Sequence, residues 1–292
     1  MSASDSRIVD LHTHSIRSDG TLTPSELLDY AVEKGLSALA LTDHDTVEGL
    51  EELHAHASVT ENAPEIVDGI EFSSEYNGKD IHIVGLFIDY SAPDFDKYLE
   101  EFRHSRDVRN EKMCKLLRDG LHMDISYEKL LEANPGAIIT RAHYSKYMME
   151  HGYTSNMKEA FERYIGEDKP FFVSREKITA IDAINLIHKT GGIAVLAHPT
   201  LYHMGYDKIR ELVSHLKENG LDAMEILYTT FTPSQKRQMK ELADEFDLMY
   251  SGGSDYHGAI KPRTDLATGW GDLSVSYEIY EKLKDFHESG YR

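Results

Sequence analysis

Cysteine is nearly absent from this chain of 292 residues, which contains only Cys114. A single cysteine excludes an internal disulfide framework and any zinc site built from several thiolates. Because Cys114 falls in a predicted helix, we expect it to be a small packed residue. Long apolar runs are also missing, so we expect neither a signal peptide nor a membrane-spanning segment, and a cytoplasmic location is the default.

Positive charge is scarce as well. Lys and Arg number 31 against 51 Asp and Glu, which gives a formal net charge of −20. A chain this acidic is not expected to bind nucleic acid through a broad basic face. A phosphate substrate would have to be held locally, by metal ions or by a small cluster of arginines.

Histidine, by contrast, is abundant, with 16 residues. The chain opens with Ile8-Val9-Asp10-Leu11-His12-Thr13-His14, an apolar-rich run that predicts a β-strand ending in His-x-His. Side chains of a strand alternate with period two, so His12 and His14 would point to the same side and could bind one divalent metal. Taken alone, the pair is equally compatible with two partly buried histidines.

Predicted strands and helices alternate in the two outer parts of the chain. The capping boxes at Thr23-Pro24-Ser25-Glu26 and Thr232-Pro233-Ser234-Gln235 each predict the start of a helix. Between about Ala92 and Phe172 only helices are predicted, the last of them from Asn156 to Tyr164, and a further helix is predicted from about Val275 to His287. Repeated β–α units predict a parallel sheet that closes into a TIM-like α/β barrel. Residues 1–91 and 173–292 would form this barrel, and residues 92–172 would be a helical insertion that contributes to the substrate pocket.

Further histidines and carboxylates recur where predicted strands begin or end. Glu71, for example, follows a strand predicted from Glu65 to Ile70, and His82 lies near the start of the next. The full set is His12, His14, Asp19, His44, Glu71, His82, His198, Asp255 and His257. Strand ends of a parallel barrel meet at one face, and nine N/O ligands without a thiolate would suit two or three ions such as Mn²⁺, Zn²⁺ or Fe²⁺. Singly, each residue could instead cap a helix or satisfy a carbonyl.

Several short motifs resemble the metal motifs of the PHP (polymerase and histidinol phosphatase) family. They are Asp10-Leu11-His12-Thr13-His14, Ser18-Asp19-Gly20, Thr42-Asp43-His44-Asp45, Gly69-Ile70-Glu71, Ile81-His82, Ala197-His198-Pro199 and Ser254-Asp255-Tyr256-His257. The resemblance implies a distorted (β/α)7 barrel with a trinuclear metal site. It assigns His12, His14, Glu71 and Asp255 to one metal, Glu71, His82 and His198 to a second, and Asp19, His44 and His257 to the third.

Within that family, the helical insertion and Asp19 resemble a bacterial branch that includes 3′,5′-nucleoside bisphosphate phosphatases and a 5′→3′ oligoribonuclease. The resemblance implies that phosphate is contacted by an arginine-bearing helix and by a Thr-Arg-x-His segment. The matching residues are Arg106, Arg109, Asn110, Arg141 and His143. Arg106 and Arg109 are spaced to share one helical face, and the planar guanidinium suits phosphate oxygens. The alternative is a solvated helix face paired with nearby glutamates.

These observations predict a metal-dependent phosphoesterase. Three divalent ions would outweigh the carboxylates of Asp19, Glu71 and Asp255 by about three positive charges, which attracts a phosphate dianion. We expect manganese to be the usual metal and a metal-bridging hydroxide to attack phosphorus, whereas the sequence identifies no general acid. The expected substrate is a 3′,5′-nucleoside bisphosphate, converted to the 5′-monophosphate, or a short oligonucleotide such as an RNA end. A histidinol-phosphate or other sugar-phosphate monoesterase is the alternative, and a non-catalytic nucleotide-binding module is a third possibility. No feature indicates an oligomeric state.

Overall fold

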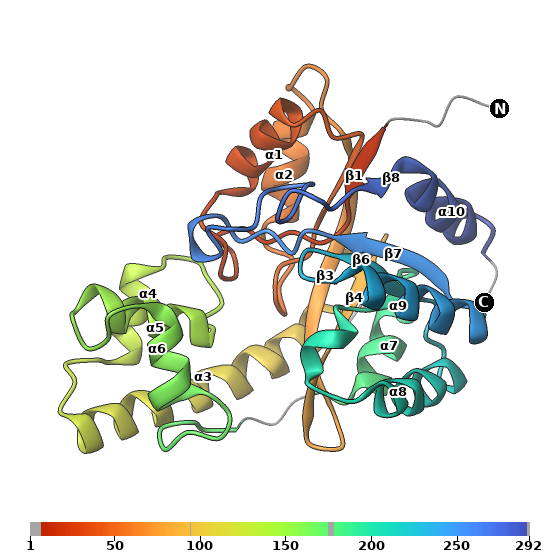
Figure 1. Ribbon diagram of the computed structural model, residues 1–292. Helices are drawn as coiled ribbons and strands as arrows, with labels where there is room; N and C mark the ends of the chain where they lie inside the picture. Colours follow the sequence, from red (N-terminus) through yellow and green to blue (C-terminus); the bar gives the residue numbers. More distant parts are fainter. Residues whose placement is uncertain (1–6, 94, 175–177, 291–292) are drawn as a thin grey trace.

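The computed structural model describes residues 7–93, 95–174 and 178–290, which form an α/β barrel with a group of helices beside it (Figure 1). The strands are β1 (Ile8–Asp10), β2 (Ala38–Leu41), β3 (Glu65–Tyr76), β4 (Lys79–Leu86), β5 (Ile193–Leu196), β6 (Ala223–Tyr228), β7 (Met249–Gly253) and β8 (Val275–Ser276). The helices around the sheet are α1 (Pro24–Glu33), α2 (Leu50–Ala57), α7 (Ala180–Lys189), α8 (Tyr206–Glu218), α9 (Pro233–Glu245) and α10 (Tyr277–Glu288). The helices beside the barrel are α3 (Phe95–Leu121), α4 (Tyr127–Ala133), α5 (Arg141–Glu150), α6 (Met157–Ala160) and the π-helix η1 (Phe161–Ile165), and short 3₁₀ turns η2 (Pro199–Tyr202) and η3 (Gly258–Ile260) follow two strands.

The described strands form one mixed sheet in the order β7-β6-β5-β4-β3-β2-β1-β8. Three neighbouring pairs are antiparallel, namely β3–β4, β4–β5 and β1–β8, and the other pairs are parallel. Beyond β1 and β7 the two sides of the sheet meet, because the amide of Asp255 donates to the carbonyl of His12 at 2.9 Å and that of His14 donates to Tyr256 at 3.0 Å. The sheet is therefore a nearly closed barrel.

The prediction of a wholly parallel sheet is wrong, and β4 is the main reason. Strand β3 continues past the predicted end at Ile70 as far as Tyr76, so Glu71 lies in mid-strand rather than at a strand end. The turn Asn77-Gly78 then leads into β4, with φ of 50° and 73°. Asn-Gly is a strong hairpin signal because both residues tolerate left-handed backbone. Since β4 runs backwards, its early residue His82 lies opposite Ser73, at the same face of the barrel as the carboxyl ends of the parallel strands.

Other predicted boundaries shift by a few residues. The helix predicted from Asn156 to Tyr164 is two elements, because it changes from α-helix to π-helix after Ala160. The helix predicted from Val275 begins only at Tyr277, since Val275 and Ser276 pair with β1 as the short strand β8.

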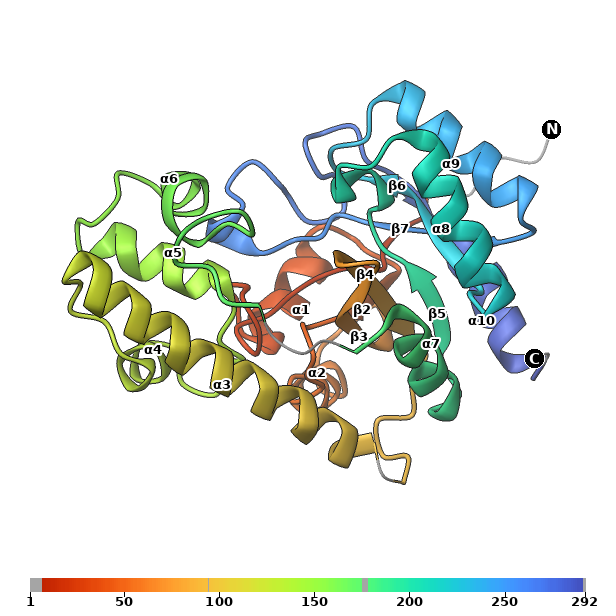
Figure 2. The ribbon, with the colours of Figure 1, turned by 90° about the horizontal axis from the view of Figure 1, so that it is seen from below.

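The two groups of helices pack around separate apolar clusters. In the barrel, β2 and β5 are buried along their whole length, with α7, α8 and α9 packed over neighbouring strands (Figure 2). Beside it, α3, α4 and α5 share a cluster that includes Leu117, Leu130 and Tyr144. Cys114 belongs to this second cluster and is buried, as expected for a packed residue. No helix within the described ranges is both long enough and apolar enough to cross a membrane.

Candidate metal and phosphate site

The nine predicted ligands come together at one face of the barrel. His12 and His14 follow β1, His44 follows β2, Glu71 and His82 stand on β3 and β4, His198 follows β5, Asp255 and His257 follow β7, and Asp19 stands in the turn before α1. Three groups have ligand atoms within 4.8 Å of one another: His14–Asp19–His44–His257, His12–His14–Glu71 and His44–Glu71–His82. Residues from six different strands or their following loops thus share one polar centre.

Glu71 lies in the middle of this centre, fully buried, with both carboxylate oxygens facing imidazoles. Its Oε1 lies 2.8 Å from Nδ1 of His82 and 3.0 Å from Nε2 of His198. Its Oε2 lies 3.4 Å from Nε2 of His12 and 3.3 Å from Nε2 of His14. With imidazoles facing both of its oxygens, Glu71 would be able to contribute to the metal groups on either side of it.

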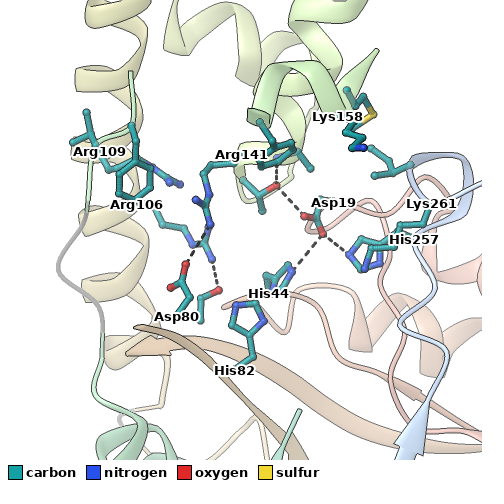
Figure 3. A pocket seen from close by; sticks show the side chains of 18 residues that line it. Asp19, His44, Asp80, His82, Arg106, Arg109, Arg141, Lys158, His257 and Lys261 are labelled. Carbon is teal, nitrogen blue, oxygen red and sulfur yellow. Dashed lines mark hydrogen bonds and ion pairs between the residues drawn. The ribbon is translucent and has the colours of Figure 1, made fainter. Parts of the chain in front are cut away.

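The other two carboxylates flank Glu71. Oδ1 of Asp255 lies 3.3 Å from Nε2 of His14. On the opposite side, Oδ1 of Asp19 lies 3.2 Å from Nε2 of His257 and 3.8 Å from Nε2 of His44 (Figure 3). Asp19, His44 and His257 therefore form the end of the cluster next to the helices of residues 95–165, and they join the rest of it through His14 and through His44, whose Nδ1 lies 2.9 Å from Oε2 of Glu71.

Several buried ligand atoms make no hydrogen bond with any residue that the structure describes. They are Nε2 of His12 and His14, Oδ1 of Asp19, Nδ1 of His44 and Oε2 of Glu71. Buried polar atoms without partners are costly, and such atoms aimed at one another are what a cation would satisfy. The nitrogen and oxygen donors, without a thiolate, suit Mn²⁺, Zn²⁺ or Fe²⁺, so these residues fit a group of divalent metals.

The electrostatics of the cluster also favour positive charge. Burial disfavours the charged form of His14, but the carboxylates of Asp255 and Glu71 outweigh it and raise the pKa of His14 to about 9. Burial likewise raises the pKa of the Glu71 carboxyl, yet the neighbouring His44 and His82 bring it well below its usual range. Carboxylates that hold protons on histidines this strongly would stabilise metal cations in the same place.

Backbone geometry at the cluster is unusual. His198 and Asp255 have φ of 30° and 54°, in the left-handed region that costs energy for residues with a side chain. Gly253 allows close approach, because a Cβ there would stand 2.5 Å from Cβ of His12. The surrounding barrel therefore compensates for local strain at two of the proposed ligands.

Sequence reasoning missed the residues that hold the ligands from behind. Nδ1 of His12 donates to Oε1 of Glu225 at 2.8 Å, which leaves Nε2 of His12 directed at the cluster. Oδ2 of Asp255 accepts hydrogen bonds from the hydroxyl of Tyr228 and from Nζ of Lys261, both at 2.6 Å. Glu225 could have been found from the sequence, because a glutamate inside a buried apolar strand is rarely without a partner.

A cavity of about 390 Å³ opens beside the cluster. Asp19, His44, His82 and His257 line one side of it together with Lys261 from the loop after η3, and cationic side chains from α3, α5 and α6 line the other (Figure 3). The cationic residues are Arg106, Arg109, Arg141, Lys158 and Lys261. A small anion in this cavity would face metal ligands and guanidinium groups together.

Two of these arginines are held by carboxylates. Both Nε and Nη2 of Arg106 donate to Oδ2 of Asp45, and Nη2 also donates to the Ser73 hydroxyl at 2.9 Å. Nη2 of Arg141 donates to Asp80 near the tip of the β3–β4 hairpin at 3.2 Å. Asp45, next to the predicted ligand His44, thus orients an arginine.

Asn110 and His143 do not line the cavity and are buried behind its wall. Nδ2 of Asn110 donates to the carbonyl of Ile139 at 3.1 Å. Burial lowers the pKa of His143 to about 4, and its neutral Nδ1 accepts the backbone amide of Thr140 at 3.0 Å. In this structure both side chains support the segment that ends in Arg141.

Comparison with known proteins agrees with this geometry. Residues 10–243 match the family described as PHP domain. The chain is 36% identical over 275 residues to a 5′-3′ exoribonuclease of Haemophilus influenzae, covering 94% of this chain and 96% of the relative. It is 33% identical over 250 residues to a 3′,5′-nucleoside bisphosphate phosphatase of Chromobacterium violaceum, covering 85% and 87%.

The fold has a close match among solved structures. An amidohydrolase from Chromobacterium violaceum, solved with bound sulfate and no metal, superposes with a TM-score of 0.84 at 31% identity. The match covers 95% of this chain and 96% of that one.

Proposed function

The chain belongs to the PHP domain family of phosphoesterases, and from this premise we propose that it hydrolyses a phosphate ester of a small nucleotide. The proposed substrates are a 3′,5′-nucleoside bisphosphate, which would yield the 5′-monophosphate, and the 5′ ends of short oligoribonucleotides. Support comes from two relatives at similar identity, one an exoribonuclease and the other a bisphosphate phosphatase. Each proposed substrate carries a second phosphate in addition to the one whose ester bond is cut.

The observation that carries the proposal is a cavity with predicted metal ligands on one side and arginines on the other. With one phosphate at the histidine–carboxylate cluster, Arg106, Arg109 and Arg141, which line the other side of the cavity, would face a second phosphate of the same molecule. Guanidinium groups match phosphate oxygens in geometry and charge. A substrate with only one phosphate would leave one side of the cavity without an anion.

The remaining lining of the cavity supports a nucleotide rather than a sugar phosphate. Apolar side chains from α6, η1, the segment that returns to the barrel and η3 contribute to the wall: Met157, Phe161, Phe172, Val173 and Ile260. The guanidinium carbon of Arg141 stands 5.3 Å from the centre of the Phe172 ring. A nucleobase can bury its flat face against such a surface, whereas a sugar would lose hydration there.

We further propose that Asp19, Glu71, Asp255 and the six predicted histidines hold two or three divalent ions, with manganese the usual one. Bound ions would supply positive charge to the phosphoryl oxygens and lower the pKa of water. Arg106, anchored by Asp45, would orient the substrate with little loss of side-chain entropy on binding. Arg141 would exchange its contact with Asp80 for a phosphate oxygen, since its guanidinium already faces the cavity.

The decisive experiment supplies Mn²⁺ to purified full-length protein together with adenosine 3′,5′-bisphosphate or a 5′-phosphorylated oligoribonucleotide a few bases long. We expect release of inorganic phosphate from the first substrate or of mononucleotides from the second, and loss of both in the His12→Ala variant. If turnover by the wild type does not exceed that of His12→Ala, the proposed function is wrong.

The sugar-phosphate alternative is separated by a substrate comparison. We expect kcat/KM for the bisphosphate to exceed that for histidinol phosphate, and Arg141→Ala to reduce the first much more than the second. Equal effects of Arg141→Ala on both substrates would favour the monoesterase. Tight nucleotide binding without turnover in metal-replete protein would favour the non-catalytic module.

A further inference from the structure

We propose that Thr140 is a positioning residue for the metal ligand Asp19, so that the helices beside the barrel complete one of its metal sites. The inference rests on the metal cluster of the proposed function. Oγ1 of Thr140 donates to Oδ2 of Asp19 at 2.9 Å, across 121 positions of sequence. The other oxygen of Asp19, Oδ1, faces Nε2 of His257 at 3.2 Å. One oxygen of this carboxylate therefore accepts the Thr140 hydroxyl, and the other faces the cluster.

The direction of the Thr140 hydroxyl is set by its own backbone neighbourhood. Thr140 is the N-cap of α5, and its Oγ1 accepts the amide of Ala142 at 3.2 Å. Two acceptors lie within reach of the hydroxyl hydrogen, Oδ2 of Asp19 at 2.9 Å and Nδ1 of His143 at 3.3 Å. Because Nδ1 of His143 already accepts the amide of Thr140, the hydroxyl donates to Asp19. Only 6% of either residue is exposed, so water does not readily replace this bond.

A second contact joins the same two segments. The amide of Ile138 donates to the carbonyl of Arg17 at 2.9 Å. The turn that carries Asp19 is itself tightly closed, because the amide of Gly20 donates to the carbonyl of Ser15 at 2.9 Å. A Cβ at Gly20 would stand 2.4 Å from the carbonyl oxygen of His14, so this turn tolerates little displacement. The segment before α5 thus holds the Asp19 turn from outside the barrel.

Losing the Thr140 hydroxyl would leave Oδ2 of Asp19 buried without a hydrogen-bond donor among the residues that the structure describes. The carboxylate would then rotate or draw in water, and Oδ1 would leave the direction it shares with His44 and His257. Partners that orient metal ligands typically change metal affinity about 10- to 100-fold when they are removed. Because Arg141 is the next residue, the same hydroxyl also links the metal ligand to the helix start that faces substrate phosphate.

The test is calorimetric titration of metal-stripped, full-length protein with Mn²⁺, without substrate. We compare the wild type with Thr140→Val, which keeps the shape and removes the hydroxyl, and with Thr140→Ser, which keeps the hydroxyl. We expect Thr140→Val to lower the affinity for one Mn²⁺ ion per chain by about 10- to 100-fold and to leave the affinities for the other ions unchanged. Thr140→Ser should retain the wild-type affinities.

A matched control separates metal positioning from helix capping. Ser126→Ala removes the N-cap of α4, where the Ser126 hydroxyl accepts the amide of Lys129 at 3.2 Å, so it should lower stability without changing Mn²⁺ affinity. The proposal would be overturned if Thr140→Val bound Mn²⁺ with wild-type affinities. It would also be overturned if Thr140→Ser or Ser126→Ala bound one Mn²⁺ ion more weakly than the wild type. Should Thr140→Val not fold, Thr140→Ala provides the same comparison. Wild-type protein that binds Mn²⁺ but does not hydrolyse nucleotides contradicts the proposed function alone, whereas wild-type protein that binds no Mn²⁺ contradicts both.

Discussion

Oε1 of Glu225 lies 2.8 Å from Nδ1 of His12, so a buried strand carboxylate directs the first predicted metal ligand toward the cluster. The other oxygen of Glu225 accepts the backbone amide of His198 at 2.6 Å. One residue of β6 therefore orients two ligands that are far apart in sequence. It selects the tautomer of His12 that leaves Nε2 available to a metal.

From this relationship we expect Glu225→Gln to weaken Mn²⁺ binding by about 10- to 100-fold. The amide is neutral, so it would no longer make His12 more basic, and its NH₂ group can present a donor where an acceptor is needed. Mn²⁺ titration and the Mn²⁺ concentration that gives half-maximal activity measure the effect. Glu241→Gln, an exposed change on α9, is the control. Equal Mn²⁺ affinity in both variants would show that Glu225 does not act through the metal ligands.

Arginine anchoring gives a second prediction. Arg106→Lys cannot reproduce the two-point contact with Asp45, and Asp45→Asn removes the charge that holds the guanidinium. We expect each change to raise KM for a nucleoside bisphosphate about tenfold with a smaller effect on kcat.

The double variant should be little worse than the more impaired single variant, because both changes act on one interaction. Arg103→Lys, on the same helix but paired with the half-exposed Glu48 at 3.1 Å, should behave like the wild type. Fully additive effects on KM would argue against the Asp45 anchor.

The apolar wall of the cavity gives a third prediction. Phe172→Ala should raise KM for adenosine 3′,5′-bisphosphate roughly 5- to 100-fold, the range expected for losing one base–aromatic contact. The same change should leave KM for a ribose bisphosphate without a base nearly unaltered, which controls for disturbance of Arg141. A similar loss on both substrates would mean that Phe172 supports the arginine rather than the base.

A pH-dependent contribution to stability is expected at Glu65, where β3 begins. Its carboxylate accepts hydrogen bonds from the hydroxyls of Tyr277 and Tyr280 and forms an ion pair with Lys284, all on α10. Burial alone would raise its pKa, but Lys284 and the tyrosines lower it to about 2. Because the pKa of Glu65 is lowered in the folded protein, its carboxylate stabilises the fold at pH values above 4.5, the ordinary pKa of the group. This stabilisation is lost as the pH falls from 4.5 toward 2.

Glu65→Gln should therefore lower the free energy of unfolding at pH 7 by less than about 1 kcal/mol, since the carboxylate is partly exposed to solvent. The difference from the wild type should shrink between pH 4.5 and pH 3, as measured by urea denaturation. Glu281→Gln, which removes an exposed pair with Arg7 at 3.7 Å, should show no such trend. A difference that is independent of pH would contradict the assignment.

Sequence alone was sufficient for features that depend on near neighbours. The capping boxes at Thr23 and Thr232 are present because the cap and its partner are three residues apart. The strand predicted to end in His12 and His14 instead ends at Asp10, although both imidazoles still reach the same cluster. The phosphoesterase family and the barrel were predicted correctly, because the short histidine and carboxylate motifs from which the family was inferred can be read directly from the sequence.

Only the tertiary structure decided which distant groups meet. The reversed direction of β4 depends on the hairpin at Asn77-Gly78, and it brings His82 to the same face as the other ligands. The contacts of Glu225 with His12 and of Thr140 with Asp19 join residues more than 100 positions apart. Hydrogen bonds act over about 3 Å, so the spacing of residues along the chain carries no information about such pairs until the chain has folded.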